Sequence, residues 1–228
     1  MKLYIYEHCP FCVRPRIIIG LKSLDIPLIY LANDDEQAHL DRIGKKQVPF
    51  LEKDNGSYLI ESLAICEFLN SFDQHHVLSP KNDNSNLITL MEQLNKAAKT
   101  LIYPRCIEHP QNQVDFPTEN AKNYFRRKKE AYVGCFAACF RFPEAGIGET
   151  QPILEKINQN MTYKYATADQ PSWDDIMIFP MLRMLTLAED VITIPTNIKG
   201  YLELLSERTN IALYKKYDYH QNLSLKPL

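Results

Sequence analysis

The sequence has no long apolar run, little net charge and no repeated segment. No stretch reaches the about 18 apolar residues that a membrane-spanning helix needs. The amino terminus offers a single lysine and the short run LYIY instead of the apolar centre of a signal peptide. A formal net charge of −2 argues against broad attraction to nucleic acid or anionic membranes. These absences predict a cytoplasmic protein with no nucleic-acid partner and no stable membrane association.

Cysteine is also scarce, with six residues in 228, and a chain of this length can bury a core without disulfide bonds. The content of 45% hydrophobic and 24% charged residues is typical of a folded globular protein. In a reducing compartment, a close cysteine pair is more often catalytic or metal-binding than structural. The feature to explain is therefore the pair Cys9 and Cys12 in the segment YEHCPFCVRPR.

Strand and helix patterns alternate in the first 72 residues. Residues 2–6 predict a strand, and a helix follows with Cys9 at the N-cap and Pro10 at the first helical position. Residues 26–32 predict a second strand, parallel to the first because the connection is long enough for a crossover. A short helix ending at Gly44, a hairpin and a helix from Glu61 complete the order β-α-β-α-β-β-α.

The character of the chain changes after this unit. Residues 73–86 are polar, contain a proline and predict a linker between domains. Helical periodicity begins at Leu87, continues through a predicted helix at 121–140, and is most apolar at 172–189. Because no strand alternation follows, residues 87–228 predict an all-helical second domain, within which 214–228 receive no structural assignment.

The position of the cysteine pair favours thiol–disulfide chemistry. A C-x-x-C at the start of a helix that follows a first strand is the usual context of redox motifs. Free N–H groups and the helix dipole favour the thiolate of Cys9, which makes it the nucleophile. Cys12, one turn later, can attack a mixed disulfide at Cys9 and is the resolving thiol. Arg14 and Arg16 follow and can add positive potential or attract an anionic ligand.

Two other interpretations of the pair remain. A zinc site needs four ligands, and the only other spaced cysteine pair, Cys135 and Cys139, lies in an apolar helical segment. Simple packing is the second alternative, because cysteine is often buried. The position after the first strand and the proline between the thiols favour redox chemistry over both, so no metal is expected.

The other cysteines, the histidine pair and the basic run receive structural interpretations. Core packing is expected for Cys66, Cys135 and Cys139, and exposure is possible for Cys106 before a proline-containing loop. The pair His75 and His76 is expected to be solvated. The basic run FRRKKE at 125–130 projects around a helix and is interpreted as a solvated face.

The motifs together resemble those of glutaredoxins and glutathione transferases. The CPFC motif after the first strand resembles a glutaredoxin site, with Phe11 where these proteins usually carry tyrosine. The segment GKKQVPFL resembles the one that carries the cis-proline of thioredoxin-like folds, and YLIESLAICEFL resembles the Glu-Ser segment of glutathione transferases. The segment PSWDDI resembles the transferases' capping box, with Ser172 as N-cap and Asp175 three residues later. Nearly the whole chain is similar to the large bacterial glutaredoxins, the glutaredoxin 2 family.

This resemblance implies a fold and a set of ligand-binding residues. The fold is an α+β thioredoxin- or glutaredoxin-like domain joined to an all-α domain, as in glutathione transferases. Val48, before a cis-Pro49, pairs with the cysteinyl part of glutathione; Glu61 and Ser62 receive its γ-glutamyl end. The ring of Phe11 packs against the ligand without a hydroxyl. Ser172 and Asp175 have a structural role only.

The predicted function is glutathione-dependent thiol–disulfide oxidoreduction. Glutathione is a co-substrate, no cofactor is bound permanently, and the other partners are protein disulfides and glutathionylated proteins. The family resemblance implies a monomer. One alternative is a glutathione transferase or dehydroascorbate reductase that uses Cys9 alone, for which Cys12 has no purpose. A second resembles the intracellular chloride-channel proteins, which share the fold and associate with membranes.

Overall fold

The first part of the chain is a small sheet covered by three helices. The computed structural model of the protein describes residues 1–73, 75–80, 85–161 and 171–219. Its first elements are β1 (Lys2–Ile5), α1 (Pro10–Leu21), β2 (Leu28–Tyr30), α2 (Gln37–Ile43), β3 (Phe50–Glu52), β4 (Tyr58–Ile60) and α3 (Ser62–Ser71). The predicted order β-α-β-α-β-β-α is confirmed.

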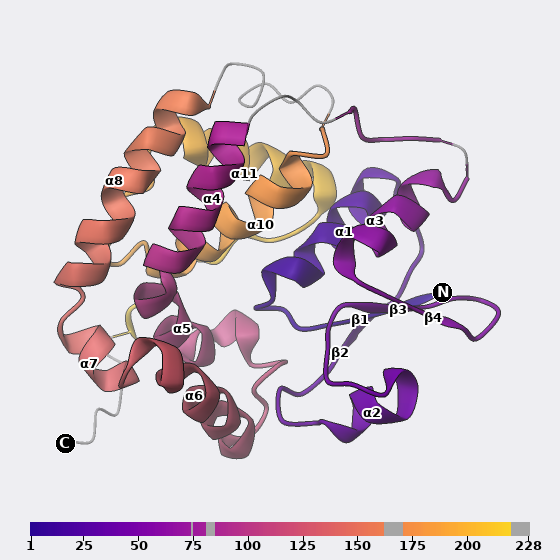
Figure 1. Cartoon of the computed structure of the whole chain (residues 1–228), viewed down its shortest axis with the longest axis horizontal. Coiled ribbons are helices and arrows are strands. Elements are labelled where there is room, and N and C mark those ends of the chain that lie inside the picture. Colours follow the sequence, from indigo (N-terminus) through magenta and orange to yellow (C-terminus); the bar gives the residue numbers. More distant parts are fainter. Residues whose placement is uncertain (74, 81–84, 162–170, 220–228) are drawn as a thin grey trace.

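The four strands pair in the order β2-β1-β3-β4. β1 is parallel to β2, as expected from the helical crossover between them, and antiparallel to β3. The hairpin of β3 and β4 turns at Gly56, whose φ of +78° favours glycine. Helices α1 and α3 cover one face of the sheet and α2 the other (Figure 1). This places the start of α1 at the carboxyl end of β1.

The second part of the chain is helical in all its described elements. They are α4 (Ser85–Ala97), α5 (Lys99–Glu108), α6 (Glu119–Val133), α7 (Phe136–Arg141), α8 (Glu144–Asn160), α10 (Asp175–Leu185), α11 (Thr196–Thr209) and two 3₁₀ turns, Pro110–Asn112 and Thr186–Ala188. The helices form one bundle beside the sheet (Figure 1). The C-terminal segment, to which the sequence analysis assigns no structure, is described to residue 219. Within it Tyr214 and Tyr219 are buried, and 220–228 lie outside the described residues.

Helix α1 joins the two parts because it packs against α3 in its own domain and against α10 and α11 in the bundle. Gly20 permits this contact: a Cβ atom there would lie only 2.0 Å from the carbonyl oxygen of Thr209. A buried ion network also crosses this interface. The carboxylate of Glu7 accepts hydrogen bonds from Arg16, at 2.9 Å, and from Arg183 of α10. One buried carboxylate thus pairs with a guanidinium group from each part of the chain, which links the two parts at their interface.

Two sequence expectations about helix limits are wrong. The helix predicted at 121–140 is two helices, because the chain turns at Gly134 with a φ of +79°, a value that favours glycine. Helix α10 begins at Asp175 with Asp174 as its N-cap, not at Ser172. The side chain of Asp175 nevertheless accepts hydrogen bonds from the Ser172 backbone N–H, at 2.6 Å, and from its hydroxyl, at 3.0 Å. The predicted capping contact exists one turn before the helix.

Candidate active site

The two thiols lie where β1 passes into α1. Cys9 is the N-cap of α1 and Pro10 its first residue, as predicted, so no N–H is lost to the proline. The backbone N–H of Cys12 bonds to the Cys9 carbonyl oxygen at 3.0 Å, and the Cys12 sulfur accepts the Tyr6 N–H at 3.5 Å. Cys9 is 9% exposed and Cys12 is fully buried, so only Cys9 faces the solvent-accessible cavity.

The environment separates the acidities of the two thiols. A hydrogen bond from the Cys12 side chain is the largest effect on Cys9, and together with the charge of His8 it lowers the Cys9 pKa to about 7, against the opposing effect of burial. Burial raises the pKa of Cys12 well above its ordinary value, and the neighbouring Cys9 thiolate adds to this. Near neutral pH, Cys9 is therefore the thiolate and Cys12 the thiol that stabilises it.

The loop before Cys9 is held by a carboxylate from the helical part of the chain. Asp115 is fully buried and accepts the backbone N–H groups of Glu7 and His8, both at 2.9 Å. Its Oδ2 also lies 2.6 Å from Nδ1 of His8. The His8 ring stacks on Tyr6 and Phe116, with ring centroids 5.4 Å and 5.0 Å away. These contacts fix the imidazole next to the nucleophile.

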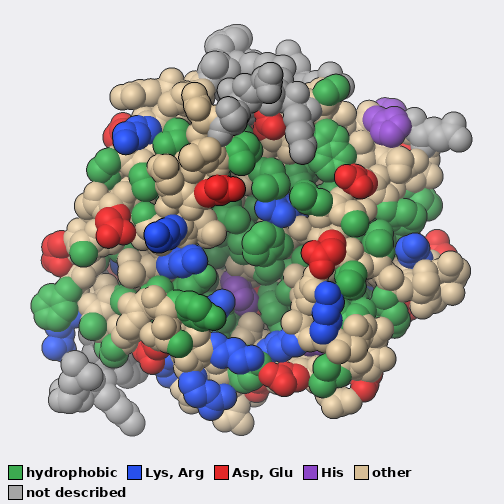
Figure 2. Space-filling view, in the orientation of Figure 1, with side chains coloured by type: hydrophobic (Ala, Val, Ile, Leu, Met, Phe, Trp, Pro, Cys, Tyr) green, Lys and Arg blue, Asp and Glu red, His purple; other side chains and the backbone are tan. Residues whose placement is uncertain are grey.

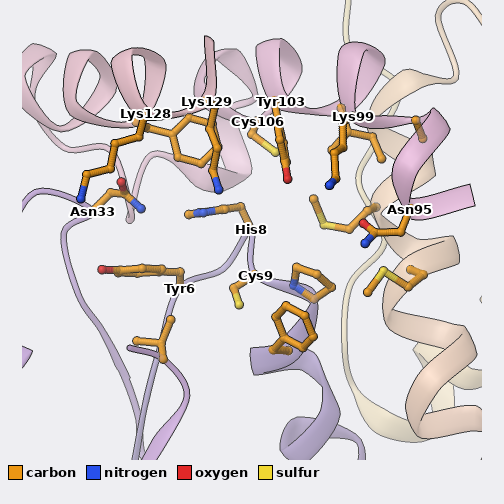
Figure 3. A pocket seen from close by; sticks show the side chains of 18 of the residues that line it. Tyr6, His8, Cys9, Asn33, Asn95, Lys99, Tyr103, Cys106, Lys128 and Lys129 are labelled. Carbon is orange, nitrogen blue, oxygen red and sulfur yellow. The ribbon is translucent and has the colours of Figure 1, made fainter. Parts of the chain in front are cut away.

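A cavity of about 530 Å³ opens above Cys9, between the two parts of the chain. This volume is in the range of small-molecule sites. The Cys9 loop and residues 46–48 line one side of the cavity, and α4, α5, α6 and α10 line the other. Figure 3 shows Cys9 on the floor of the cavity, with Tyr103, Lys99 and Lys129 extending toward it from the opposite helices.

The residues that the resemblance assigns to glutathione lie on the sheet side. Val48 and Phe11 line the cavity, and the peptide bond from Val48 to Pro49 is cis, as expected. Glu61 and Ser62 lie outside the cavity lining. Glu61 is exposed, with a φ of +70°, and accepts a hydrogen bond from Gln47 at 3.1 Å; Gln47 lines the cavity. The structure thus places Val48 and Phe11 at the cavity and links the exposed Glu61 to it through Gln47, whereas Pro49 and Ser62 are buried.

The two predicted arginines have different surroundings. Arg14 stacks over the Phe11 ring, 4.7 Å from its centroid, and donates to the Ser62 hydroxyl at 3.2 Å. Burial lowers the pKa of Arg14, and the nearby Cys66 and Cys9 oppose this to a smaller extent. Arg16 instead pairs with Glu7 and lines no part of the cavity. Its expected role in attracting an anion is not supported by this position, because its charge is balanced at the domain interface.

The other cysteines do not contribute to this site in the way the sequence suggests. Cys66 is buried, as predicted, and burial raises its pKa to about 12. Cys106 is buried, not exposed, and lines the cavity beside Tyr103 on the wall opposite Cys9 (Figure 3), because this face of α5 points inward. Cys135 is exposed and Cys139 half-buried, so the expectation that both pack in the core is wrong: the turn at Gly134 places Cys135 outside the helix.

No zinc site is formed by the described part of the chain. None of its histidine, cysteine, aspartate and glutamate side chains gather in a group of three or more that could hold a metal ion. His75 is exposed and His76 lies 3.3 Å from the amide of Asn70. Nor is any helix in the described ranges both long and apolar enough to cross a membrane.

Sequence reasoning missed the contribution of the helical domain to the site. The basic run at 125–130 is not only a solvated face: Arg127 is exposed, but Lys128 and Lys129 line the cavity. Asp115 and Lys99 carried no local signal, since their roles depend on contacts with distant residues. The basic run was the one sequence feature that could have indicated this contribution of the helical part, because four adjacent cations on a helix cannot all point away from the bundle.

Comparisons with known proteins agree with this architecture. The family model described as "Glutaredoxin 2, C terminal domain" matches residues 86–217, and "Glutathione S-transferase, N-terminal domain" matches residues 3–75. Glutaredoxin 2 of Escherichia coli (strain K12) is 34% identical over 213 residues, which are 93% of this chain and 97% of the relative. Both parts of the chain therefore match, in the same order.

Solved structures give the same result. The structure of glutaredoxin 2 from Salmonella typhimurium in complex with glutathione has a TM-score of 0.85 and 35% identity, covering 93% of this chain and 96% of the other. A glutathione S-transferase from Methylobacillus flagellatus with glutathione bound has a TM-score of 0.58 at 17% identity, over 92% and 96% of the two chains. The second likeness concerns the fold alone.

Proposed function

The chain belongs to the glutaredoxin 2 family, and from this premise we propose how its residues carry out glutathione-dependent thiol–disulfide oxidoreduction. The observation that carries the proposal is the asymmetry of the thiol pair. Cys9 faces the cavity with its pKa lowered to about 7, whereas Cys12 is buried with its pKa raised. Cys9 is therefore the attacking thiolate and Cys12 the resolving thiol.

With a glutathionylated protein, Cys9 attacks the glutathione sulfur. The bond between that sulfur and the protein sulfur breaks, and the protein thiolate leaves with the electron pair and takes up a proton. A second glutathione thiolate then attacks the same glutathione sulfur. Oxidised glutathione leaves and Cys9 returns as a thiolate, so the one free glutathione thiol that enters supplies both electrons, while the other half of the oxidised glutathione comes from the mixed disulfide. Cys12 is not needed in this cycle.

With a protein disulfide, Cys9 attacks one of the two sulfurs and forms a mixed disulfide with the protein. Cys12 loses its proton and attacks the Cys9 sulfur, which releases the second protein thiolate and leaves a Cys9–Cys12 disulfide. Two glutathione molecules then reduce this disulfide. The hydrogen bond between the two thiols supports this order, because the resolving sulfur is already next to the sulfur that it must attack.

We place the first glutathione along the sheet side of the cavity. Val48, before the cis bond, offers its backbone to the cysteinyl part, and Pro49 has no competing N–H. Ser62, the first residue of α3, and Glu61 receive the γ-glutamyl end, with helix N–H groups available for its carboxylate. Phe11 packs against the ligand, held by the guanidinium of Arg14.

The experiment that tests this proposal is glutathione-coupled reduction of hydroxyethyl disulfide by the wild type, Cys9→Ser and Cys12→Ser. Cys9→Ser is expected to lose all activity above background. Cys12→Ser is expected to keep this activity and lose the reduction of protein disulfides. Activity retained by Cys9→Ser would contradict the assignment of the nucleophile. A parallel loss in both variants would instead show that the dithiol is required for both substrates.

The remaining parts of the proposal concern partners and context. We propose that the substrates are protein disulfides and glutathionylated proteins, and that the chain acts as a monomer in the cytoplasm, where its six free cysteines stay reduced. We also propose a glutaredoxin-like domain at 1–72, a linker at 73–86 and a helical domain at 87–228, with the first turn of α4 beginning inside the linker at Ser85. Light scattering after size exclusion tests the monomer, and a mass twice that of the chain would contradict it.

A further inference from the structure

The cavity lining is cationic, mainly on the wall opposite the proposed glutathione site. Four lysines line the cavity, and none of the described aspartates or glutamates does. These lysines are Lys46 on the sheet side, Lys99 on α5, and Lys128 and Lys129 on α6. In a chain with 26 basic and 28 acidic side chains, this concentration of one sign is a local feature of the cavity. The blue side chains around the central hollow in Figure 2 show the same arrangement.

Among the described residues, three of these lysines form no ion pair with a carboxylate, and one of the three, Lys46, donates to the Asn33 carbonyl oxygen instead. Lys128 lies 3.6 Å from Glu36, whereas Lys99 and Lys129 take part in none of the ion pairs found between described residues. Lys99 is the first residue of α5, and Lys129 lies near the end of α6. Figure 3 shows both amines pointing into the cavity from different helices, that of Lys129 toward His8 and Cys9.

The position of Lys129 is electrostatically unfavourable in the free protein. Burial has the largest effect and lowers the pKa of Lys129; Cys106 and Cys9 oppose it, and the charges of Lys99 and Lys128 lower the pKa further. Its amine lies over the Tyr103 ring, 4.9 Å from the centroid, which compensates in part. Half-buried like charges without a paired carboxylate cost free energy, and a bound carboxylate would offset that cost.

We propose that Lys99 and Lys129 form a subsite for a carboxylate of the thiol or disulfide partner that meets the glutathione sulfur on Cys9. This inference rests on the proposed function and adds the chemistry of the second substrate. Exchange at sulfur proceeds in line, so the leaving protein thiol and the incoming second glutathione occupy the same position in turn. With the first glutathione along Val48, the space that remains is bounded by α5 and α6.

The apolar part of the same wall limits what can bind. Ile102, Met181, Met184 and Leu185 line the cavity beside the two lysines. Methionine-rich surfaces adapt to different partners, so they suit the methylene groups of a peptide more than a densely charged polyanion. The ligand class is therefore a peptide-like thiol or disulfide with a carboxylate near its sulfur. Two sources have this chemistry: the second glutathione molecule, and an acidic residue beside the substrate cysteine of a protein.

The glutathione source is tested on the isolated second step. A Cys12→Ser protein is loaded with one glutathionyl group on Cys9, confirmed by mass. We then measure the rate at which the glutathionyl group is released from Cys9 by glutathione and by glutathione diethyl ester, which lacks free carboxylates. Each rate is normalised to the uncatalysed rate of that thiol with hydroxyethyl disulfide. The incoming thiolate forms a disulfide with the bound glutathione, and the bond to Cys9 breaks, so only the second thiol differs between the two reactions.

The protein source is tested with two glutathionylated peptides that differ only in glutamate or glutamine beside the cysteine. In either arm, the carboxylate-bearing partner is expected to react about three- to tenfold faster than its neutral match, the range of one or two half-buried ion pairs. The preference is expected to decrease with salt. The ratio of the rate with the carboxylate-bearing partner to the rate with its neutral match is expected to fall to near one in the double variant Lys99→Gln and Lys129→Gln. Lys129→Gln alone is expected to reduce this ratio in part.

Arg127→Gln is the matched control. It removes the same charge from the exposed side of α6, so the ratio is expected to stay at the wild-type value. Lys99→Arg together with Lys129→Arg keeps the charges and is expected to keep the preference, which separates charge from folding.

The outcomes separate the proposals. If the double glutamine variant no longer prefers glutathione over its diethyl ester, the second glutathione is the ligand. If it no longer prefers the glutamate peptide over the glutamine peptide, the ligand is an acidic protein segment. Ratios that are equal in the wild type and the double glutamine variant in both arms would overturn the subsite. If Cys9 takes up no glutathionyl group at all, the proposed function itself fails, and that result is visible before any ratio is measured.

Discussion

Asp115 and His8 are 107 residues apart in the sequence, yet Oδ2 of Asp115 lies 2.6 Å from Nδ1 of His8. The same carboxylate accepts the backbone N–H groups of Glu7 and His8 at 2.9 Å. The helical part of the chain therefore holds the loop that carries Cys9. Both parts of the chain build the candidate site, and the helical part does more than cover it.

The first prediction concerns this carboxylate. Asp115→Asn replaces one carboxylate oxygen with an NH₂ group. Because Oδ1 accepts one donor and Oδ2 accepts two, an N–H of the loop must then face another donor. We expect a loss of about 1–3 kcal/mol in the free energy of unfolding, measured by urea titration. Asp25→Asn, at an exposed carboxylate, is the control and should change little. Equal unfolding midpoints for the two variants would contradict the role of Asp115.

The second prediction concerns the reactivity of the thiols. Since the pKa of Cys9 is lowered to about 7, its alkylation by iodoacetamide should increase about tenfold per pH unit below pH 7 and level off above it. Cys12 and Cys66 should stay unmodified at pH 7, because both are buried and their pKa values are raised. Peptide mass mapping assigns the modified residues and separates Cys9 from the exposed Cys135. Alkylation of Cys12 before Cys9 would reverse the assignment.

The third prediction tests the effect of His8 on the nucleophile. The charge of His8 lowers the Cys9 pKa, so His8→Gln should raise it, and the alkylation midpoint should move to higher pH. Glutamine still offers an N–H near Asp115, which limits the structural change. His75→Gln is the matched control, because His75 is an exposed histidine in the segment between the domains. A midpoint that is the same in all three proteins would show that hydrogen bonding from Cys12 sets the Cys9 pKa without His8.

Local patterns were sufficient for the parts of the fold and site that depend on local contacts. The N-cap at Cys9, Pro10 at the first helical position and the turn at Gly56 follow from backbone preferences of single residues. The cis bond before Pro49 came from the family resemblance and not from spacing. These features need no knowledge of how distant parts of the chain pack.

Apart from the break at Gly134, which is a local backbone preference, the missed features depend on tertiary contacts. Lys129 is half-buried because α6 turns one face to α5, and Cys106 is buried because the same helices pack around it. Neither residue type predicts such a position, since lysine and cysteine occur in both exposed and buried places. The pairing of Arg16 with Glu7 likewise depends on the interface with α10. Sequence periodicity shows which face of a helix is apolar, but not which helix covers it.

The fourth prediction concerns the contact before α10. The Ser172 hydroxyl donates to Asp175 at 3.0 Å and accepts the Asp174 N–H at 3.3 Å. Ser172→Ala removes both bonds at a buried position and should lower the free energy of unfolding by about 0.5–2 kcal/mol. Ser71→Ala, at the exposed end of α3, should change it by less than about 0.5 kcal/mol. Because Ser172 touches no part of the cavity, the turnover of folded Ser172→Ala should equal that of the wild type.

The fifth prediction tests the packing of the two domains through a pair of glycines. A Cβ atom at Gly20 of α1 would lie 2.0 Å from the Thr209 carbonyl oxygen of α11, whereas one at Gly200 would meet nothing within 4 Å. Gly20→Ala must push the helices apart and should destabilise the protein by about 1–3 kcal/mol. Gly200→Ala lies within α11 and should stabilise it by up to about 1 kcal/mol, because alanine is the better helix former. Urea unfolding of the two variants measures both changes. Since backbone rather than a flexible side chain opposes the new methyl group at Gly20, a neutral result there would show that α1 and α11 are farther apart in solution than in this structure.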